Sequence, residues 1–302
     1  MHDLINDLAQ SISGDICFNF DDELENNKQS TAVSEKARHL SFNRQRYEMM
    51  RKFEAFHKAK CLRTLVALPT HYIFYIFHFK LPDSVGHLYN LQTLILRNCY
   101  RLVELPMGIG GLINLQHVDI SGAVQLQEMP PQMGNLTNLQ TLSDFIVAEV
   151  ADEEVEPFPF LRELTIRRCS KLCIHLPHCL PSLVKLDIFG CPNLKVPFSG
   201  FASLDCANLE KLPNGLRSLI SLQELKLERC PKLVSFPEAA LSPLLRSLVL
   251  QNCPSLICFP NGELPATTLK HLRVEDCENL ESLPEEMMHH KSSSTVGKTL
   301  VP

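Results

Sequence analysis

Tryptophan is absent from this chain of 302 residues, and aromatic residues make up only 7% of it. That scarcity suits many small core layers rather than one large core. The net charge is only −5, which argues against a nucleic acid or an acidic membrane as partner, because both favour concentrated Lys and Arg. No apolar run approaches the roughly 20 residues that a bilayer crossing needs, and no signal-peptide pattern opens the chain. We therefore expect a cytoplasmic protein that does not span a membrane.

Leucine, by contrast, is abundant and recurs with a fixed period. The frame Leu-x-x-Leu-x-Leu-x-x-Cys occupies residues 91–99 and 245–253, and residues 269–277 repeat it with one Val in a Leu position. Most neighbouring copies start 22 to 24 residues apart, and one longer step, from Leu183 to Leu222, contains a damaged copy. A period of this length with this frame is that of a leucine-rich repeat.

Each copy predicts one short strand, because its apolar residues alternate with variable ones. The segment after the strand often ends in Leu-Pro, as at Leu105-Pro106, and proline there favours a loop or a 3₁₀ turn over an α-helix. Stacked copies place their strands side by side in parallel. The predicted fold class is therefore an α/β leucine-rich-repeat solenoid, a horseshoe with a parallel β-sheet on its concave face.

The repeats predict an array over residues 39–290 that is irregular in two places. Residues 68–80 have no repeat spacing and are either an insertion or a scar. Residues 201–209 keep the repeat cysteine but have lost part of the strand. The polar residues 291–302 predict a disordered tail.

The chain has 12 cysteines, and several of them share one repeat position after the strand. A small thiol there closes the turn, so we interpret these cysteines as packing residues in a reducing cytosol rather than as disulfides. Residues 169–179 hold five possible zinc ligands, but their spacing is irregular, and we expect no metal site. The repeat cysteines are Cys99, Cys169, Cys191, Cys206, Cys230, Cys253 and Cys277.

Motifs for catalysis are incomplete. Gly297-Lys298-Thr299 matches only the end of a phosphate-binding loop, because Ser292 stands where that motif needs its first glycine. The histidines are scattered, and a repeat surface seldom brings side chains together in a dry pocket. We therefore expect that this protein is not an enzyme.

The outward positions of the strands are better candidates for function. The third, fifth and seventh residues of each copy point away from the core, on the concave side, and they mix both signs of charge with a few apolar side chains. A large mixed face of this kind suits a protein partner better than a polyanion. The candidate binding residues are Arg97, Asp119, Glu163, Arg167, Lys185, Asp187, Phe189, Glu224, Lys226, Glu228, Arg273 and Glu275.

Three phrases carry a resemblance to a known family. The chain has Met-His-Asp-Leu at residues 1–4, Ala-Arg-His-Leu-Ser at 37–41, and Leu-Ser-Asp-Phe at 142–145, where Asp144 takes an apolar repeat position. These phrases resemble plant coiled-coil, nucleotide-binding, leucine-rich-repeat disease resistance proteins. The chain looks like a C-terminal part of such a protein, beginning at its Met-His-Asp motif.

The resemblance implies that residues 1–38 are a small winged-helix remnant, with His2 near the β-phosphate of bound ADP and Asp3 supporting that arrangement. We expect no cofactor here, because the ADP site would also need the nucleotide-binding module that precedes the motif in the family. The implied function is recognition of a pathogen effector or a guarded host protein, together with autoinhibition of a nucleotide-binding domain. The alternatives are an ADP/ATP-binding switch remnant and a degenerate repeat protein that does not signal.

Overall fold

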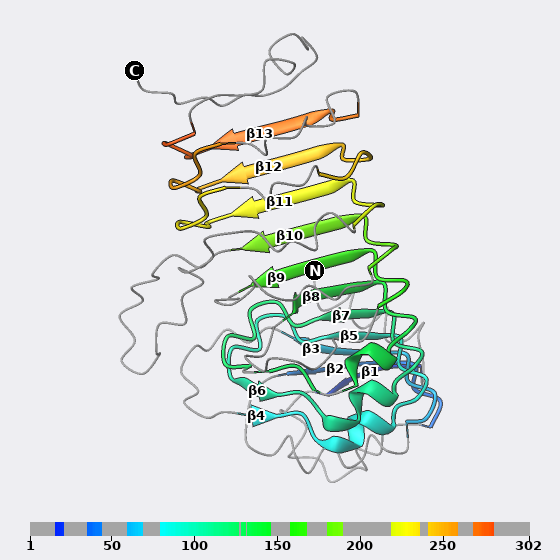
Figure 1. Cartoon of the computed structure of the whole chain (residues 1–302). Helices are drawn as coiled ribbons and strands as arrows, with labels where there is room; N and C mark the ends of the chain where they lie inside the picture. The colour runs from blue at the N-terminus through cyan, green and yellow to red at the C-terminus, as the bar shows by residue number, and fades with distance from the viewer. Residues whose placement is uncertain are drawn as a thin grey trace, which may run out of the picture. The chain divides into compact units, whose positions relative to one another are not determined.

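The described part of the chain consists of short parallel strands joined by turns, as the computed structural model shows (Figure 1). It divides into two compact units, Met1–Leu142 and Ser143–Pro302. The residues that the structure describes are 16–20, 35–43, 59–68, 79–126, 128–130, 132–145, 158–167, 180–189, 219–235, 241–258 and 268–280.

In the first unit the parallel strands follow one another in chain order, because each coil of the repeat stacks on the coil before it. Equivalent leucines lie opposite each other, so that Leu65 of one strand faces Leu94 of the next. These strands are β1 (Cys17–Phe20), β2 (His39–Asn43), β3 (Thr64–Leu68), β5 (Thr93–Ile95) and β7 (His117–Asp119). A further strand, β8 (Thr141–Phe145), crosses the division between the units.

The second unit repeats the same order. Leu186, Leu225, Leu248 and Leu272 lie opposite one another on four neighbouring strands, so that the register is kept without a shift. The strands of this unit are β9 (Glu163–Arg167), β10 (Lys185–Phe189), β11 (Glu224–Glu228), β12 (Ser247–Gln251) and β13 (His271–Glu275).

The Leu-Pro segments of the first unit lead into 3₁₀ turns, as the prolines predicted. Pro82 and Pro106 stand directly before the first two of these turns. A Cβ atom at Gly110 would lie 2.5 Å from the carbonyl oxygen of Gln132, so only glycine lets the second and third turns approach this closely. The turns are η4 (Asp83–His87), η5 (Met107–Gly111) and η6 (Met133–Asn135), and a short parallel pair, β4 (Phe79–Lys80) with β6 (Leu102–Glu104), lies between repeat strands in the sequence.

The core confirms the alternation predicted from the sequence. In β10 and β12 every second residue is buried and the residues between are half-buried. Leu91, Leu94 and Leu96 are completely buried, and each such leucine contributes roughly 1.5–3 kcal/mol through removal from water. Asp144 is buried in an apolar position with a left-handed φ of 59°, which places it where the sequence predicted. The structure therefore confirms a leucine-rich-repeat solenoid with a parallel sheet.

The winged-helix remnant predicted for residues 1–38 is not confirmed. Cys17–Phe20 pairs in parallel with His39–Asn43, so the described strand of this segment belongs to the repeat sheet. The backbone N–H of Arg38 donates to the carbonyl of Ile16, which joins the two coils at that point. The separate predictions for residues 1–15, 69–78, 201–209 and 291–302 concern residues outside the described ranges.

Candidate interaction surface

The strand face is the side of each parallel sheet that points away from the core, and the Leu-x-x-Leu-x-Leu frame decides which residues lie on it. Because side chains alternate along a strand, the buried leucines leave the third and fifth residues of each copy on the opposite side. In the first unit this face is mostly uncharged. On β3, β5 and β7 its members are Thr64, Val66, Thr93, Ile95, His117 and Asp119.

Asp119 organises the polar contacts of the first unit's strand face. Arg97 lies in the turn after β5 and donates from Nε to Oδ2 of Asp119 at 2.8 Å, and its Nη2 lies 2.7 Å from the same oxygen. The backbone N–H and the hydroxyl of Ser121 donate to Oδ1 of Asp119, at 3.0 and 2.5 Å. Both carboxylate oxygens are thus engaged within the molecule, which holds Arg97 across two neighbouring coils.

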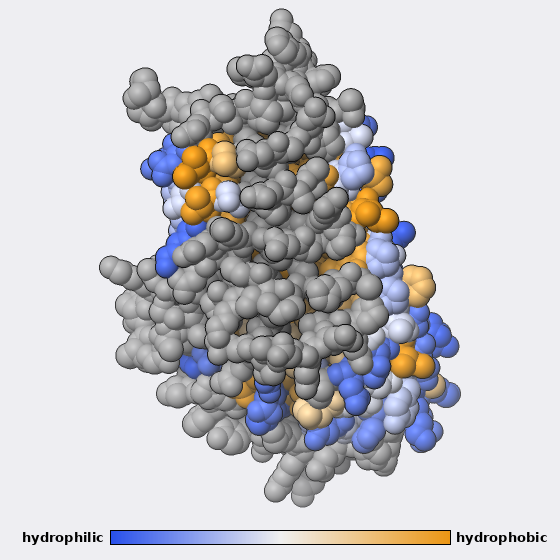
Figure 2. Space-filling view, viewed as in Figure 1, coloured by the Kyte–Doolittle hydropathy of each residue, from blue (hydrophilic) through white to orange (hydrophobic). Residues whose placement is uncertain are grey.

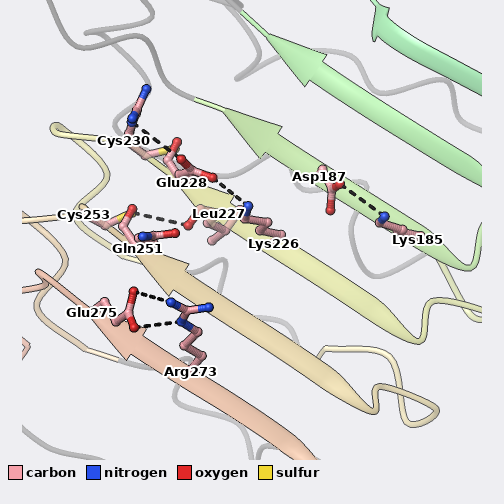
Figure 3. A network of polar contacts seen from close by, with 11 residues as sticks. Lys185, Asp187, Lys226, Leu227, Glu228, Cys230, Gln251, Cys253, Arg273 and Glu275 are labelled. Atoms are coloured by element: carbon pink, nitrogen blue, oxygen red, sulfur yellow. Dashed lines mark hydrogen bonds and ion pairs between the residues drawn. The ribbon is translucent and has the colours of Figure 1, made fainter. Parts of the chain in front are cut away.

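The second unit's strand face is charged, and its ion pairs follow one pattern. On three strands a cation stands two residues before an anion and pairs with it (Figure 3). The Nζ of Lys226 lies 2.7 Å from Glu228, and Arg273 holds both oxygens of Glu275 at 2.8 and 2.9 Å. The third pair joins Lys185 to Asp187 at 3.6 Å.

Lys226 of β11 also interacts with two residues of β10. Lys226 lies opposite Asp187 in the register, and its ammonium stands 4.9 Å from the ring centre of Phe189. Burial raises the pKa of Asp187 above its usual range, against the opposing effect of Lys185 and Lys226. The two lysines therefore partly offset the cost of burying the Asp187 carboxylate, and Lys226 also contacts the ring of Phe189.

The predicted binding residues divide into groups. The largest group lies on β10 and β11 and consists of Asp187, Phe189, Lys226 and Glu228. A second group is the ion pair of Arg273 with Glu275 on β13. The third is the ion pair of Arg97 with Asp119 in the first unit. Glu163 and Glu224 are exposed at strand starts. Arg167 ends β9, and nothing is described of its side chain. His2 and Asp3 lie outside the described residues.

Sequence analysis missed Arg229, which extends the ion pair of β11. Its Nε lies 3.5 Å from Glu228, and its backbone is left-handed, with a φ of 56°. The same conformation recurs at Asn98, Asn252 and Asp276, each directly before a repeat cysteine. Asparagine and aspartate at that recurring position were the available signal, because both tolerate left-handed backbone better than most residues.

The repeat cysteines form hydrogen bonds at the ends of the strands. The thiols of Cys230, Cys253 and Cys277 each donate to the carbonyl of the residue two positions earlier, at 3.6, 3.4 and 3.3 Å. A hydrogen bond with the Cys230 thiol, together with burial, raises the pKa of Cys253 from 9.0 to about 12. Thiols that stay protonated in this way are unreactive, which supports their interpretation as packing residues. In the described ranges no group of His, Cys, Asp and Glu could hold a metal ion.

Large exposed apolar side chains lie apart from this charged face. Tyr89, Ile113, Ile220 and Leu244 are all about half exposed or more, and each precedes a strand within its turn. In Figure 2, apolar and hydrophilic residues alternate along the margins of the molecule. Among the described helices, none is long and apolar enough to cross a membrane.

The comparisons with known proteins agree with this geometry. A family model described as a leucine-rich repeat region matches residues 52–195. A putative disease resistance RPP13-like protein of Arabidopsis thaliana is 31% identical over 139 residues, which is 42% of this chain and 11% of that protein. A second putative disease resistance protein of that plant is 36% identical over 66 residues, 22% of this chain and 4% of the relative.

The leucine-rich repeat domain of the type III effector XopL is a structural neighbour, with a TM-score of 0.48 and 21% identity over 90% of this chain and 80% of that one. The chain is a leucine-rich-repeat solenoid protein. It is related in sequence to plant disease resistance proteins, and it spans about a tenth or less of the length of the two that it matches. The family resemblance seen in the sequence is confirmed at this level.

Proposed function

We propose that this protein is a protein-interaction module of plant defence, and that the strand face of the second unit recognises a pathogen effector or a guarded host protein. The observation that carries the proposal is the row of ion pairs on β10, β11 and β13. The relatives' role in disease resistance supports the setting. We assign the protein a binding role in the cytoplasm without a catalytic step.

The energetics of these ion pairs suit recognition. The cations of these pairs are a third or more exposed, and ion pairs open to solvent contribute only about 0–1 kcal/mol to folding, so the charges on this face add little to the stability of the solenoid. Their arrangement matters more for a partner, because complementary charges raise association rates and reject wrong partners. Val249 and Gln251 on β12 lie between the pairs of β11 and β13, which leaves an uncharged strip for closer contact.

Autoinhibition is the second part of the proposal. In a longer protein of this family, the same mixed-charge face would compete between a nucleotide-binding domain and the recognised protein. One face would then couple recognition to release of that domain. The resemblance of the first residues to the Met-His-Asp motif supports this setting. Addition of a purified nucleotide-binding domain should displace a protein partner if both use this face.

Charge reversal at two exposed glutamates tests the recognition surface. Glu163 and Glu224 start β9 and β11, and neither is needed for the core, so Glu163→Lys with Glu224→Lys should leave the thermal midpoint nearly unchanged. The double variant, used as bait in plant extract, should lose interaction partners that the original chain captures. The matched control is Arg246→Glu, an exposed residue before β12 that is not on the strand face.

Two outcomes would count against the proposal. Capture of the same proteins by the original chain and by the double variant would exclude this face as the recognition surface. Equal loss with Arg246→Glu would show that a charge reversal outside the strand face disturbs binding just as much, so the face would not be the specific recognition surface. Submicromolar ADP affinity in calorimetry would instead favour the nucleotide-switch alternative.

A further inference from the structure

β13 is the last strand of the second unit's sheet, and its coil is covered less well than the coil before it. Leu272, Cys277 and Leu280 are 9%, 8% and 8% exposed. Their counterparts one coil earlier, Leu248, Cys253 and Leu256, are all 0% exposed. The outer flank of the β13 coil therefore retains apolar surface that a further strand would bury.

No described strand pairs with the outer edge of β13. The N–H of His271 donates to the carbonyl of Arg246, and the carbonyl of Glu275 accepts from the N–H of Asn252, at 2.9 Å in both cases. These bonds turn the odd-numbered residues of β13 toward β12. Because backbone groups alternate in direction along a strand, the N–H and C=O of Val274 point to this outer edge.

The side chains along this edge are complementary to themselves. The sequence Arg273-Val274-Glu275 places a cation and an anion on either side of an apolar residue. In an antiparallel pair about a two-fold axis at Val274, Arg273 would face the partner's Glu275 and Glu275 the partner's Arg273. Arg273 and the partner's Glu275 would then form a non-hydrogen-bonded cross-strand pair, in which the Cα atoms are about 4.5 Å apart.

We propose that two copies of this chain associate through β13, which pairs antiparallel with the partner's β13 and extends the sheet across a two-fold axis. The Val274 backbone groups of each copy bond those of the other, and the charges form two reciprocal ion pairs. The interface is isologous, so it closes at two copies. A parallel, in-register pairing would oppose like charges and is disfavoured. This inference shares Arg273 and Glu275 with the proposed recognition face, but it rests on the backbone edge of β13 rather than on that face.

Sedimentation of the full chain over a wide concentration range tests the pairing. The original chain should pass from monomer to dimer as concentration rises, and the amide of Val274 should become protected from hydrogen exchange in the dimer. Arg273→Glu and Glu275→Arg, made separately, should each weaken the dimer at least tenfold, because each places like charges opposite each other.

The two variants also rescue each other. Mixed in equal amounts, Arg273→Glu and Glu275→Arg should form a dimer, because each supplies the charge that the other lacks. The variant with both substitutions should dimerise like the original chain. Rescue in the mixture shows that each variant is folded, which removes misfolding as an explanation for the loss.

The matched control is Glu224→Lys, on the strand face of β11, which has a neighbour on each side. It should leave the dimer unchanged although it removes the proposed defence contact, so failure of one proposal is distinguishable from failure of the other. A chain that stays monomeric at every concentration would overturn the inference. So would single variants that dimerise as tightly as the original, or a mixture without rescue.

Discussion

The two units use the same buried leucines but join their coils with different side chains. In the first unit, an asparagine stands directly before the first leucine of the β5, β7 and β8 copies and donates to a carbonyl of the preceding coil, at 2.8 Å for Asn90, Asn114 and Asn138. In the second unit hydroxyl groups make the equivalent bond. Ser182, Ser221 and Thr268 donate to the preceding coil from the same position, at 2.7, 2.6 and 2.9 Å, and Ser242 does so from three residues before Leu245, at 3.1 Å.

The buried leucines that set the repeat period are the same in both units, whereas the side chains that join neighbouring coils differ. Leu91 and Leu245 begin their copies with the same complete burial, whichever donor precedes them. Amide and hydroxyl groups can both supply this bond, but burial of the leucine does not require it, because Phe160 stands directly before the equally buried Leu161. The strand faces differ more, because Val66 and Ile95 in one unit correspond in position to Asp187 and Lys226 in the other. Binding chemistry can thus change while the core stays constant.

The largest expected effect concerns the close approach of turns in the first unit. Gly110→Ala places a methyl group 2.5 Å from the carbonyl oxygen of Gln132 and should destabilise the protein by about 2–3 kcal/mol. Gly111→Ala is the control, because a Cβ there meets nothing within 4 Å. Urea unfolding of both variants measures the difference. Equal midpoints would show that the turns of the first unit are not closely packed.

The cysteines of the second unit should make stability depend on alkaline pH. The pKa of Cys253 is about 12 in the folded chain against an ordinary 9.0, so above pH 9 the unfolded chain loses a proton that the folded chain keeps. Stability should therefore be complete below pH 9 and fall as pH rises toward 12, by about 1–2 kcal/mol near pH 10.5. Cys253→Ala should flatten this fall in urea titrations.

Two comparisons make that pH test specific. Ala123 already occupies the equivalent buried position in the first unit, so Cys253→Ala should fold. Cys61→Ala, which removes an exposed thiol of the first unit, is the matched control for the substitution itself. If Cys253→Ala showed the same alkaline loss as the original chain, the loss would come from groups other than this thiol.

A smaller effect should distinguish the two kinds of coil-joining bond. Asn114→Ala leaves the carbonyl of Tyr89 without its donor and should cost about 1 kcal/mol, whereas Ser221→Ala should cost about 0.5 kcal/mol. Thr137→Ala, an exposed change in a turn of the first unit, should be near neutral. Thermal unfolding ranks the three. A larger loss of stability in Ser221→Ala than in Asn114→Ala would show that the hydroxyl bond, not the amide bond, contributes more to joining the coils.

The smallest effect concerns the residue before the repeat cysteine. Arg229 holds a left-handed backbone where Asn98 stands in the first unit, so Arg229→Asn should stabilise the protein by about 0.5 kcal/mol. Asn252→Arg introduces the opposite change at the same repeat position and should destabilise by a similar amount. Calorimetry can resolve both shifts. If neither variant changed the free energy of unfolding, the ion pair of Arg229 with Glu228 would stabilise the protein by as much as the left-handed backbone of Arg229 destabilises it.

Much of the fold followed from the leucine frame, and less of the site did. The strands around Leu94, Leu225 and Leu248 form as predicted, because a period of two with one buried side admits a single register. The strand at Cys17–Phe20 lies in the segment predicted as a winged-helix remnant, and its membership of the repeat sheet was not predicted. It lacks the leucine frame, and only its pairing with β2 shows where it belongs.

The sequence by itself determined the coil period, the parallel strands and the set of side chains facing outward, because local alternation and the repeat length decide all three. Tertiary structure alone decided which outward residues meet. Lys226 contacts Phe189 because stacking brings residues 37 positions apart in the chain onto neighbouring strands. It also decided that the Cys253 thiol forms hydrogen bonds with those of Cys230 and Cys277, and that no described strand pairs with the outer edge of β13. These properties depend on distances between coils, which no single repeat contains.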